Sequence, residues 1–342
     1  MSALISGSHV FMRQPKNWWR QCIEILSKEG IPSRPDVPLA PYTSFRLGGP
    51  ARVFVKPAGE RDLLTVLKLA AERGWPLLLL GGGSKLLIGD GGLDAMVVDV
   101  RAALNFMTMD EDGIEVAAGV PIRAVARWAS VQGLSGLEFF AGVPGSVGGA
   151  VYMNAGGREY EMAKVVRSLT LYDLATGRVV TVAGAEMGFG YRDSALRHAR
   201  QIALKARLIL RPDDPDKSRA VMAELLDRRR RAQPAQWPSA GSVFQNPPGF
   251  RASALLDQAG ARGWRIGGAE VPSLHANFIV NRRNARADDV FQLMRRMHAV
   301  IRDRFTVRLY PEIIGLGFGP AWREAFELPS PDGLAPLLRD RG

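Results

Sequence analysis

Cysteine is nearly absent from this chain of 342 residues, since Cys22 is its only cysteine. A single thiol excludes an internal disulfide and fits a protein of a reducing, cytoplasmic compartment. Cys22 lies in WWRQCIEIL, where we expect a packed thiol rather than a reactive one. The sequence also lacks any run of about 18 apolar residues, so we expect no membrane span. Its first residues contain no long apolar segment followed by a cleavage site, so we expect no secretory signal.

Histidine is also scarce, and the four histidines are His9, His198, His275 and His298. None of them has the spacing that metal ligands need, so we expect no metal site. His298 lies on the clearest predicted helix, and we expect its side chain to be partly exposed.

Acidic residues are outnumbered, with 34 Asp and Glu against 45 Lys and Arg, for a net charge of +11. Such an excess is found in proteins that bind nucleic acid, anionic membranes or anionic small molecules. The densest basic run is residues 228–231, at the predicted end of a helix before Pro234, where cations suit the helix dipole. A nucleic-acid site would interleave aromatic residues with the charges, and none accompany this run. The charge therefore favours a phosphate-bearing ligand, and we expect no nucleic acid.

Apolar periodicity indicates an α+β chain of two principal lobes. From residue 51 onward, strand patterns such as ARVFVKP, PLLLL and AMVVDV alternate with helix patterns such as RDLLTVLKLAAERG. The strand-rich segment 163–211 ends at RPDDPDK, the best candidate boundary. The clearest helix, residues 287–305, has an apolar stripe at helical spacing. We predict a lead-in at residues 1–40, lobes at 41–212 and 213–319 with a last strand near 306–314, and a poorly packed tail at 320–342.

Two glycine-dense loops lie beside buried runs in the first lobe. Glycine admits positive φ and removes side chains, so backbone N–H groups can face an anion. The first loop has the spacing of neither a Walker loop nor GxGxxG. A tight turn explains one such loop as well as phosphate binding does, whereas two loops in one lobe favour an extended diphosphate ligand. The residues of interest are Gly81, Gly82, Gly83 and Ser84 in the first loop, and Gly142, Gly145, Ser146 and Gly149 in the second.

Three polar stretches far apart in the chain supply a cation, a hydroxyl and a carboxylate. They are YRDSAL around Arg192, SAGSVFQNP around Ser242 and LYPEIIGLG around Glu312. Taken singly, each residue is better explained by an ordinary turn or strand end. Behind the two loops, the three together suggest a nucleotide-cofactor enzyme with a proton-transfer site.

Five motifs occur in one order: LGGGSKLLIGDGG, GLEFFAGVPGSVGGAVYMNAG, YRDS, GSVFQNP and a late PE followed by apolar residues. With these motifs the chain resembles the UDP-N-acetylenolpyruvoylglucosamine reductase family over about residues 40–318. The resemblance implies an FAD-binding domain of the vanillyl-alcohol-oxidase (PCMH) type, followed by a C-terminal α+β substrate domain. It also implies non-covalent FAD, NADPH as the hydride donor, and UDP-N-acetylglucosamine enolpyruvate, a peptidoglycan precursor, as the substrate.

The resemblance gives roles to individual positions. Ser242 matches the family's proton donor, while Arg192 and Glu312 match its other two catalytic positions. Hydride transfer from reduced flavin leaves enolate character that a cation stabilises, and the neighbouring carbon then takes a proton. Tyr191 and Asn246 match substrate-binding positions. The positions matched to FAD binding are Gly81, Gly82, Gly83, Ser84, Lys85, Gly142, Gly145, Ser146, Gly149, Ala150 and Asn154.

Lys85 departs from the family pattern, in which the first loop usually reads GGGSN. A lysine is able either to face the flavin diphosphate as a point charge or to turn away from it, and both stay open. One side chain of the 228–231 cluster, with Gln233, is a candidate for the UDP diphosphate, and the sequence does not select which. The segment after Asn154 is short, which is typical of the family's compact subtype.

Two other functions stay open. A flavin oxidase of the same fold is disfavoured because the glycine loops carry no histidine for covalent flavin attachment and because of the Ser/Arg/Glu trio. A basic nucleic-acid-binding protein, with purely structural glycine loops, is the other alternative. Flavin released on heating would exclude the nucleic-acid-binding protein. Substrate-dependent NADPH oxidation with little oxygen turnover would exclude the oxidase. The sequence does not indicate an oligomeric state.

Overall fold

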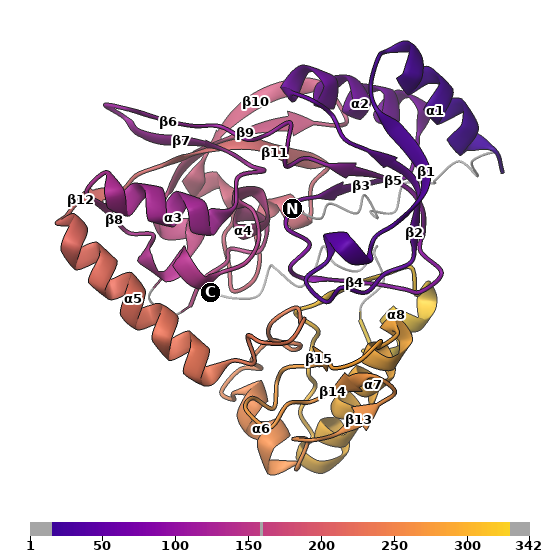
Figure 1. Ribbon diagram of the computed structural model, residues 1–342, viewed down its shortest axis with the longest axis vertical. Helices are drawn as coiled ribbons and strands as arrows, with labels where there is room; N and C mark the ends of the chain where they lie inside the picture. The colour runs from indigo at the N-terminus through magenta and orange to yellow at the C-terminus, as the bar shows by residue number, and fades with distance from the viewer. Residues whose placement is uncertain (1–15, 158–159, 329–342) are drawn as a thin grey trace.

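The protein consists of two lobes, seen in a computed structural model that describes residues 16–157 and 160–328 (Figure 1). The N-terminal lobe (residues 16–232) contains two sheets with helices packed on them, and the smaller C-terminal lobe (residues 233–328) surrounds a short three-stranded sheet. This arrangement confirms the α+β class predicted from the periodicity. Within the described residues, no helix is both long enough and apolar enough to cross a membrane.

The first sheet is mostly parallel and is buried on both faces. Its strands lie in the order β1 (Ser33–Pro38), β2 (Pro50–Val55), β5 (Leu93–Asp99) and β3 (Leu77–Leu80), with only β1 antiparallel to its neighbour. Because side chains alternate along a strand, Leu77 and Leu79 share a core with α1 (Trp18–Lys28) and α2 (Glu60–Arg73). Leu78 and Leu80 enter a second core on the opposite face. Burial on both faces explains why this strand is apolar throughout.

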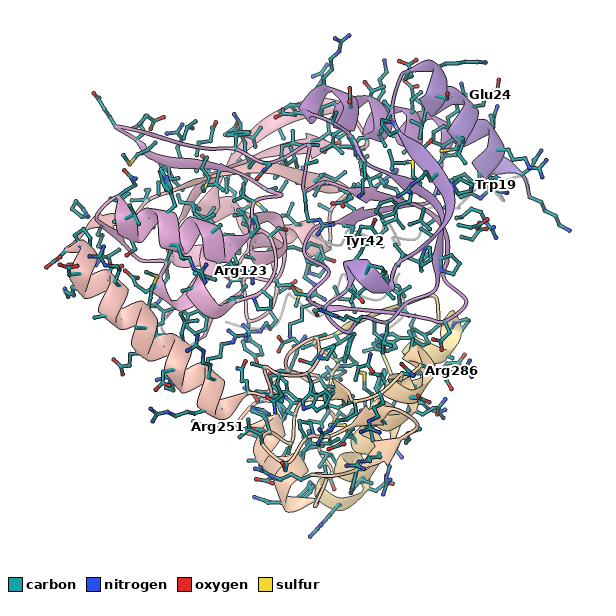
Figure 2. All side chains as sticks on the ribbon, in the orientation of Figure 1. Trp19, Glu24, Tyr42, Arg123, Arg251 and Arg286 are labelled. Carbon is teal, nitrogen blue, oxygen red and sulfur yellow. The ribbon has the colours of Figure 1, made fainter. Side chains whose placement is uncertain are left out.

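The predicted lead-in (residues 1–40) is not a separate segment: from residue 18 onward it is part of the N-terminal lobe. Trp18, Cys22 and Leu26 of α1 are buried against the first sheet, whereas Glu24 on the opposite face points to solvent (Figure 2). Cys22 is fully buried, and burial raises the pKa of its thiol to about 12, which confirms the expected packed thiol. The helical spacing of these apolar residues makes α1 part of the N-terminal lobe. Residues 1–15 of the lead-in lie outside the described residues.

The second sheet is antiparallel, and the second glycine loop bonds to residues 118–120, which follow one of its inner strands. The strand order is β10 (Arg178–Ala183), β9 (Val166–Asp173), β11 (Gln201–Leu208), β7 (Gly113–Ala117) and β6 (Met107–Asp110). Helices α3 (Ile122–Val131) and α4 (Val147–Tyr152) pack beside it, and a short pair is formed by β8 (Leu134–Ser135) and β12 (Arg211–Pro212). The N-cap of α4 is Ser146, whose Oγ accepts a hydrogen bond of 3.3 Å from the Gly149 N–H. This cap fixes the loop where it enters α4.

Helix α5 (Pro215–Ala232) packs on the N-terminal lobe, although the predicted boundary lies at residue 212. Met222 belongs to the core of this lobe, and the Ser218 hydroxyl donates a 2.9 Å hydrogen bond to buried Glu138. The Pro/Asp stretch before it is a helix start rather than a domain boundary. Asp214 caps the first turn and Pro215 occupies the first helical position.

The C-terminal lobe packs around α7 (Ala287–Phe305). Its sheet contains β13 (Arg265–Ile266), β14 (Ala269–Glu270) and β15 (Val280–Asn281), and α6 (Ala252–Gln258) lies beside α7. The predicted apolar stripe of α7 is buried, as expected. His298 is only 2% exposed, so the expectation of partial exposure is wrong. Its Nδ1 lies 3.0 Å from the Leu309 carbonyl oxygen, a contact between segments that helical periodicity does not reveal.

The predicted tail is wrong for its first residues. Helix α8 (Pro320–Ala325) packs on α7, with Trp322 and Phe326 buried in the C-terminal core and ring contacts to Phe291. Large aromatic side chains on both sides of the short helix outweigh its proline and glycine content. Residues 329–342 of the predicted tail lie outside the described residues.

A strand pair and several side-chain contacts join the lobes. Strand β16 (Ile314–Leu316) pairs in parallel with β4 (Leu86–Ile88) of the N-terminal lobe, with Ile314 opposite Leu86. The carboxylate of Asp90 accepts hydrogen bonds from the first N–H groups of α7, near Arg286 (Figure 2). The predicted last strand near 306–314, which would have carried Glu312, is wrong: pairing with β4 places the strand at Ile314–Leu316, and Glu312 lies just before it. Parallel pairing brings the residues that precede each strand, Lys85 and Glu312, side by side.

Candidate active site

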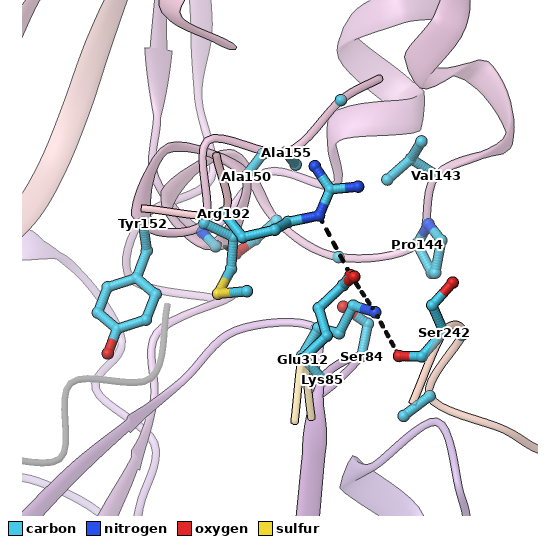
Figure 3. Close-up of a pocket in the computed structure, with 18 of the residues that line it drawn as sticks. Ser84, Lys85, Val143, Pro144, Ala150, Tyr152, Ala155, Arg192, Ser242 and Glu312 are labelled. Atoms are coloured by element: carbon cyan, nitrogen blue, oxygen red, sulfur yellow. Dashed lines mark hydrogen bonds and ion pairs between the residues drawn. The ribbon is translucent and has the colours of Figure 1, made fainter. Parts of the chain in front are cut away.

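A cavity lies between the two lobes and encloses about 1060 Å³ of space, counting its open mouth (Figure 3). Both glycine loops contribute to one side of it, and the three polar stretches reach it from separate parts of the chain. The predicted site residues that line it are Gly82, Gly83, Ser84, Lys85, Gly145, Ser146, Gly149, Ala150, Arg192, Ser242 and Glu312. The structure therefore brings most of the predicted site to one place.

The two glycine loops touch each other and form the glycine wall, defined here as residues 82–84 and 145–149. A Cβ atom on Gly82 would lie 2.6 Å from the Cα of Gly145, and Gly83 has a φ of +58°. These positions therefore require glycine. The N–H groups of Gly82, Gly83 and Ser84 donate no hydrogen bond within the described part of the chain. The glycine wall thus offers unbonded amides beside the cavity, as a phosphate site needs.

Charged and polar side chains that line the cavity form one linked cluster (Figure 3). The Lys85 Nζ lies 2.7 Å from Glu312 Oε1 and donates a 3.2 Å hydrogen bond to the main-chain oxygen of Ser242. The Nε of Arg192 lies 3.3 Å from the same Glu312 oxygen. The family resemblance matched Lys85 to FAD binding and left its orientation open; in the structure its ammonium pairs with Glu312. The pairing of β4 with β16 brings the two residues together, and the sequence of the loop carries no signal for it.

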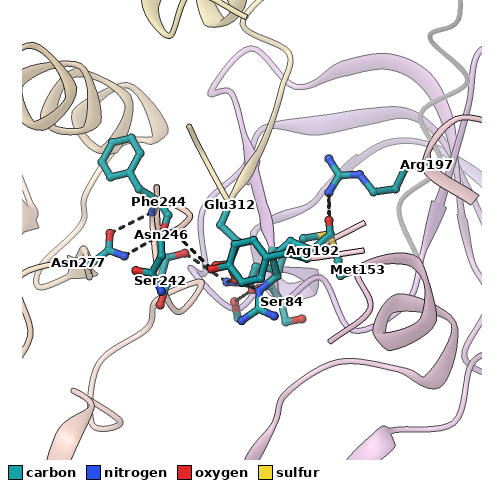
Figure 4. Close-up of polar contacts among 12 residues, drawn as sticks. Ser84, Met153, Arg192, Arg197, Ser242, Phe244, Asn246, Asn277 and Glu312 are labelled. Atoms are coloured by element: carbon teal, nitrogen blue, oxygen red, sulfur yellow. Dashed lines mark hydrogen bonds and ion pairs between the residues drawn. The ribbon is translucent and has the colours of Figure 1, made fainter. Parts of the chain in front are cut away.

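A buried asparagine supports the Ser242 segment (Figure 4). The Asn277 side chain accepts a 3.0 Å hydrogen bond from the Phe244 N–H and donates one of 2.8 Å to the Phe244 carbonyl. The Val243 N–H donates to the Asn277 carbonyl, and the Glu312 N–H donates to the Val243 carbonyl at 2.8 Å. Ser242 and Glu312 are therefore fixed relative to each other through the backbone. Sequence reasoning missed Asn277, because its partners lie more than 30 residues away.

Arg192 lies in a turn with a strained backbone. Its φ is +58°, an uncommon value for a residue other than glycine. The Arg197 side chain donates a 2.7 Å hydrogen bond to the Arg192 carbonyl and so stabilises the turn (Figure 4). The guanidinium of Arg192 also lies 5.0 Å from the ring centre of Tyr191. Apart from Glu312, no described residue forms an ion pair or a hydrogen bond with the guanidinium of Arg192.

Glu312 is held in its ionised form although it is buried. Burial by itself raises the pKa of a carboxyl, but the nearby charges of Lys85 and Arg192 outweigh it and lower the pKa of Glu312 below its ordinary value. Its side chain is 7% exposed. The cluster therefore contains a carboxylate flanked by two cations and has an excess of one positive charge.

Arg229 is the member of the basic cluster that reaches the cavity. It lines the main cavity together with Gln233, the residue that follows α5, while the exposed Arg231 pairs with Asp227. Burial lowers the pKa of Arg229, and no acidic partner faces it among the described residues. A desolvated cation without a partner suits an anionic ligand.

Five predicted site residues do not line the main cavity. Gly81 is buried behind the loop, and Gly142 borders a smaller neighbouring cavity. Asn154 uses its amide inside the protein, donating to Glu161 and Gly190 and accepting from Ala163. Tyr191 is 52% exposed, and its hydroxyl accepts a hydrogen bond from the Asn246 N–H. The Asn246 side chain in turn accepts from the Ala252 N–H at the start of α6.

Metal ligands do not gather at the site. No group of three or more His, Cys, Asp or Glu side chains suited to a metal ion occurs among residues 16–157 and 160–328. The described residues that line the cavity include no histidine and no cysteine.

Known families match both lobes. Residues 51–183 match the FAD binding domain family, and residues 233–316 match the family described as UDP-N-acetylenolpyruvoylglucosamine reductase, C-terminal domain. The two matches lie on either side of α5, in agreement with the packing of the lobes.

Similar proteins cover most of the chain. A UDP-N-acetylenolpyruvoylglucosamine reductase of Symbiobacterium thermophilum is 40% identical over 83% of this chain and 92% of its own length. One of Clostridioides difficile is 36% identical over 86% of this chain and 96% of its own. Among solved structures, the UDP-N-acetylenolpyruvylglucosamine reductase of Thermus caldophilus is 35% identical, with a TM-score of 0.70 over 84% of this chain and 98% of its own.

Proposed function

The chain belongs to the UDP-N-acetylenolpyruvoylglucosamine reductase family of peptidoglycan precursor synthesis, and from this premise we propose that it reduces UDP-N-acetylglucosamine enolpyruvate with electrons that NADPH delivers through FAD. It is an oxidoreductase with an FAD-binding domain. One observation carries the proposal: the glycine wall and the cluster of Lys85, Arg192, Ser242 and Glu312 line the same cavity. The reaction needs both, because it combines a flavin site with a proton-transfer site.

The glycine wall fits the diphosphate of FAD. Its unbonded amides at residues 82–84 can donate to phosphate oxygens. A side chain at position 82 would collide with the main chain of Gly145, so the two loops pack this closely only with glycine there. The lack of a histidine or cysteine among the described residues of the cavity supports non-covalent binding. When bound, the flavin supplies the hydride-carrying redox centre, and the protein supplies position and electrostatics.

Arg192 would stabilise the negative charge that develops on the substrate. Its Nε makes the closest contact with Glu312, and its two terminal amino groups point away from that carboxylate (Figure 3). They are available to a substrate carboxylate, which a guanidinium binds in a two-pronged geometry. A preorganised cation in a partly buried site is more effective than one in water.

Ser242 would donate the proton, and Glu312 would orient the groups around it. A serine hydroxyl is a poor acid in water and needs stabilisation of the alkoxide that it becomes. Lys85 and Arg192 supply a net positive environment beside it, and the backbone bond from Glu312 to Val243 holds the Ser242 segment in place. The ionised state of Glu312 makes it a poor proton donor, which favours the serine for that role.

The test separates the two half-reactions. Purified protein should contain flavin that is released on heating, and anaerobic NADPH should bleach it. UDP-N-acetylglucosamine enolpyruvate should then restore the flavin absorbance, whereas UDP-N-acetylglucosamine, which lacks the enolpyruvyl group, should not. Oxygen that restores the absorbance as fast as the substrate does would indicate an oxidase. A protein that takes up no flavin would contradict the proposal.

A further inference from the structure

Lys85 makes the shortest contact in the cluster and links the lobes. Its Nζ lies 2.7 Å from Glu312 Oε1 and 3.2 Å from the main-chain oxygen of Ser242, both in the C-terminal lobe. The Lys85 main chain is held as well, because its carbonyl accepts a 2.8 Å hydrogen bond from the Ile314 N–H of β16. The side chain is 25% exposed and lines the cavity, so its charge is only partly screened by water.

Lys85 and Arg192 contact the same carboxylate oxygen of Glu312. Lys85 has the shorter contact, and the closest approach of Arg192 is 3.3 Å, through Nε, with its terminal amino groups turned away (Figure 3). A guanidinium and a free carboxylate favour a parallel two-pronged pair. Without the ammonium, Glu312 would be free to take that pair and would occupy the terminal amino groups that the substrate needs.

The charges around the cavity show what Lys85 balances. Among the described lining residues, Glu312 is the single carboxylate, facing the cations Lys85, Arg192 and Arg229. The other titratable side chain that lines the cavity is Tyr152, whose pKa is raised by burial, so it stays neutral. With Lys85 neutralising Glu312, Arg192 remains as a cation for an incoming carboxylate.

We propose that Lys85 is a positioning residue for the second half-reaction: it pairs with Glu312, keeps that carboxylate away from a two-pronged pair with Arg192, and joins both to the Ser242 segment. The inference rests on the proposed function, since it concerns the step in which the enolpyruvyl substrate is reduced. Lys85 acts through Glu312 and Arg192. It therefore leaves flavin binding and flavin reduction to other residues.

The consequence for pH has a definite sign. Burial raises the pKa of Glu312, and Lys85 and Arg192 together lower it below its ordinary value. Removal of the Lys85 charge leaves Arg192 as the remaining partner, so the pKa of Glu312 rises. Reoxidation that needs the Glu312 carboxylate slows as the pH falls and the carboxylate is protonated. In a variant without the Lys85 ammonium, this slowing begins at a pH higher by roughly one unit or more.

The experiment compares Lys85→Met, which removes the charge, with Lys85→Arg, which keeps it. The matched control is Lys205→Met, because Lys205 and Arg207 flank Glu115 on the second sheet as Lys85 and Arg192 flank Glu312. Flavin content, reduction by NADPH and reoxidation by the enolpyruvyl substrate are measured against pH. An infrared titration of the oxidised protein follows the protonated carboxyl band of Glu312, identified by its loss in Glu312→Gln, and needs no turnover.

We expect Lys85→Met to keep its flavin and its reduction by NADPH. Its kcat/KM for reoxidation should fall roughly 10- to 100-fold, mainly through a higher KM. The acidic limb and the Glu312 infrared band should both move to higher pH. Lys85→Arg should return the acidic limb and the infrared band to the pH values of the unmodified protein, and Lys205→Met should behave as the unmodified protein.

Three outcomes would overturn the inference. The first is an unchanged KM, acidic limb and infrared band in Lys85→Met. The second is an equal loss of both half-reactions or of flavin, which would make Lys85 a cofactor or folding residue. The third applies if Lys85→Met does not fold. It is a Glu312 infrared band that titrates at a different pH in Lys85→Arg than in the unmodified protein. If the unmodified protein is not reoxidised by the enolpyruvyl substrate, the proposed function fails first and the inference falls with it.

Discussion

At the scale of single residues, the site depends on how a weakly acidic serine can give up a proton. We expect Ser242→Ala to leave flavin reduction by NADPH intact and to slow reoxidation by substrate roughly 10²- to 10⁴-fold, because it removes the proposed general acid. Stopped-flow absorbance of the flavin measures each half-reaction. Ser239→Ala, in the same segment but outside the cavity lining, is the control. An equal loss of both half-reactions would contradict the role of Ser242.

The support of that serine can be tested through Asn277. Asn277→Ala leaves the buried N–H and carbonyl of Phe244 without their side-chain partner, at a cost of about 1–3 kcal/mol for each group. We expect a lower melting temperature and slower reoxidation, with unchanged reduction by NADPH. Asn281→Ala is the control, because its side chain bonds the Phe45 carbonyl and the Ala285 N–H away from the Ser242 segment. Equal slowing in both variants would show a loss of stability rather than of positioning.

Residue identity could be predicted from motifs, but residue contacts could not. Arg192, Ser242 and Glu312 occur in an order that suggested one site, and all three line one cavity. Asn154 belongs to the same set of motifs, yet its amide is bonded within the protein. The engagement of Lys85 with Glu312 depends on a partner 227 residues away in the numbering, which no local pattern encodes.

At the scale of elements, the β4–β16 pair determines where Lys85 and Glu312 meet. The two strands run close together beyond the pair, where a Cβ on Gly89 would lie 2.8 Å from the carbonyl oxygen of Gly317. Gly89→Ala should therefore push the strands apart and lower the free energy of unfolding by about 1–3 kcal/mol. It should also move the acidic limb of reoxidation in the same direction as loss of Lys85.

Gly91 supplies the matched control for that prediction. It lies two residues further along the same loop, and a Cβ there would meet no atom within 4 Å. We expect Gly91→Ala to unfold at the same denaturant concentration as the unmodified protein. If the two substitutions have the same effect on denaturant unfolding, the close strand contact is not what holds the lobes together.

Long periodic elements could be predicted from the sequence, whereas short elements fixed by distant contacts could not. The stripe of α7 and the apolar strand β3 follow directly from helical and strand spacing. Strand β16 has only three residues and depends on pairing with β4. Helix α8 has six residues, and the packing of Trp322 and Phe326 stabilises it rather than its own propensity.

At the scale of the whole molecule, the cavity exists only because both lobes contribute to it. The glycine wall belongs to the N-terminal lobe, while Ser242 and Glu312 come from the C-terminal lobe. The two-lobe plan could be predicted from the change of pattern along the chain, but the boundary could not. Helix α5 follows a Pro/Asp stretch that resembles a linker and yet packs back on the first lobe.

The joined lobes predict how the protein responds to loss of flavin. A ligand that binds only the folded state at 100 times its dissociation constant stabilises it by about 2.7 kcal/mol. Although the glycine wall lies in one lobe, β16 and the Asp90 cap of α7 couple the other lobe to it. We therefore expect calorimetry to show a single transition that rises by roughly 3–5 °C when FAD is added to the flavin-free protein. Two transitions of which FAD moves only one would show that the lobes unfold independently. Gly89→Ala, which weakens the strand contact, should bring the protein closer to that behaviour, and Gly91→Ala should not.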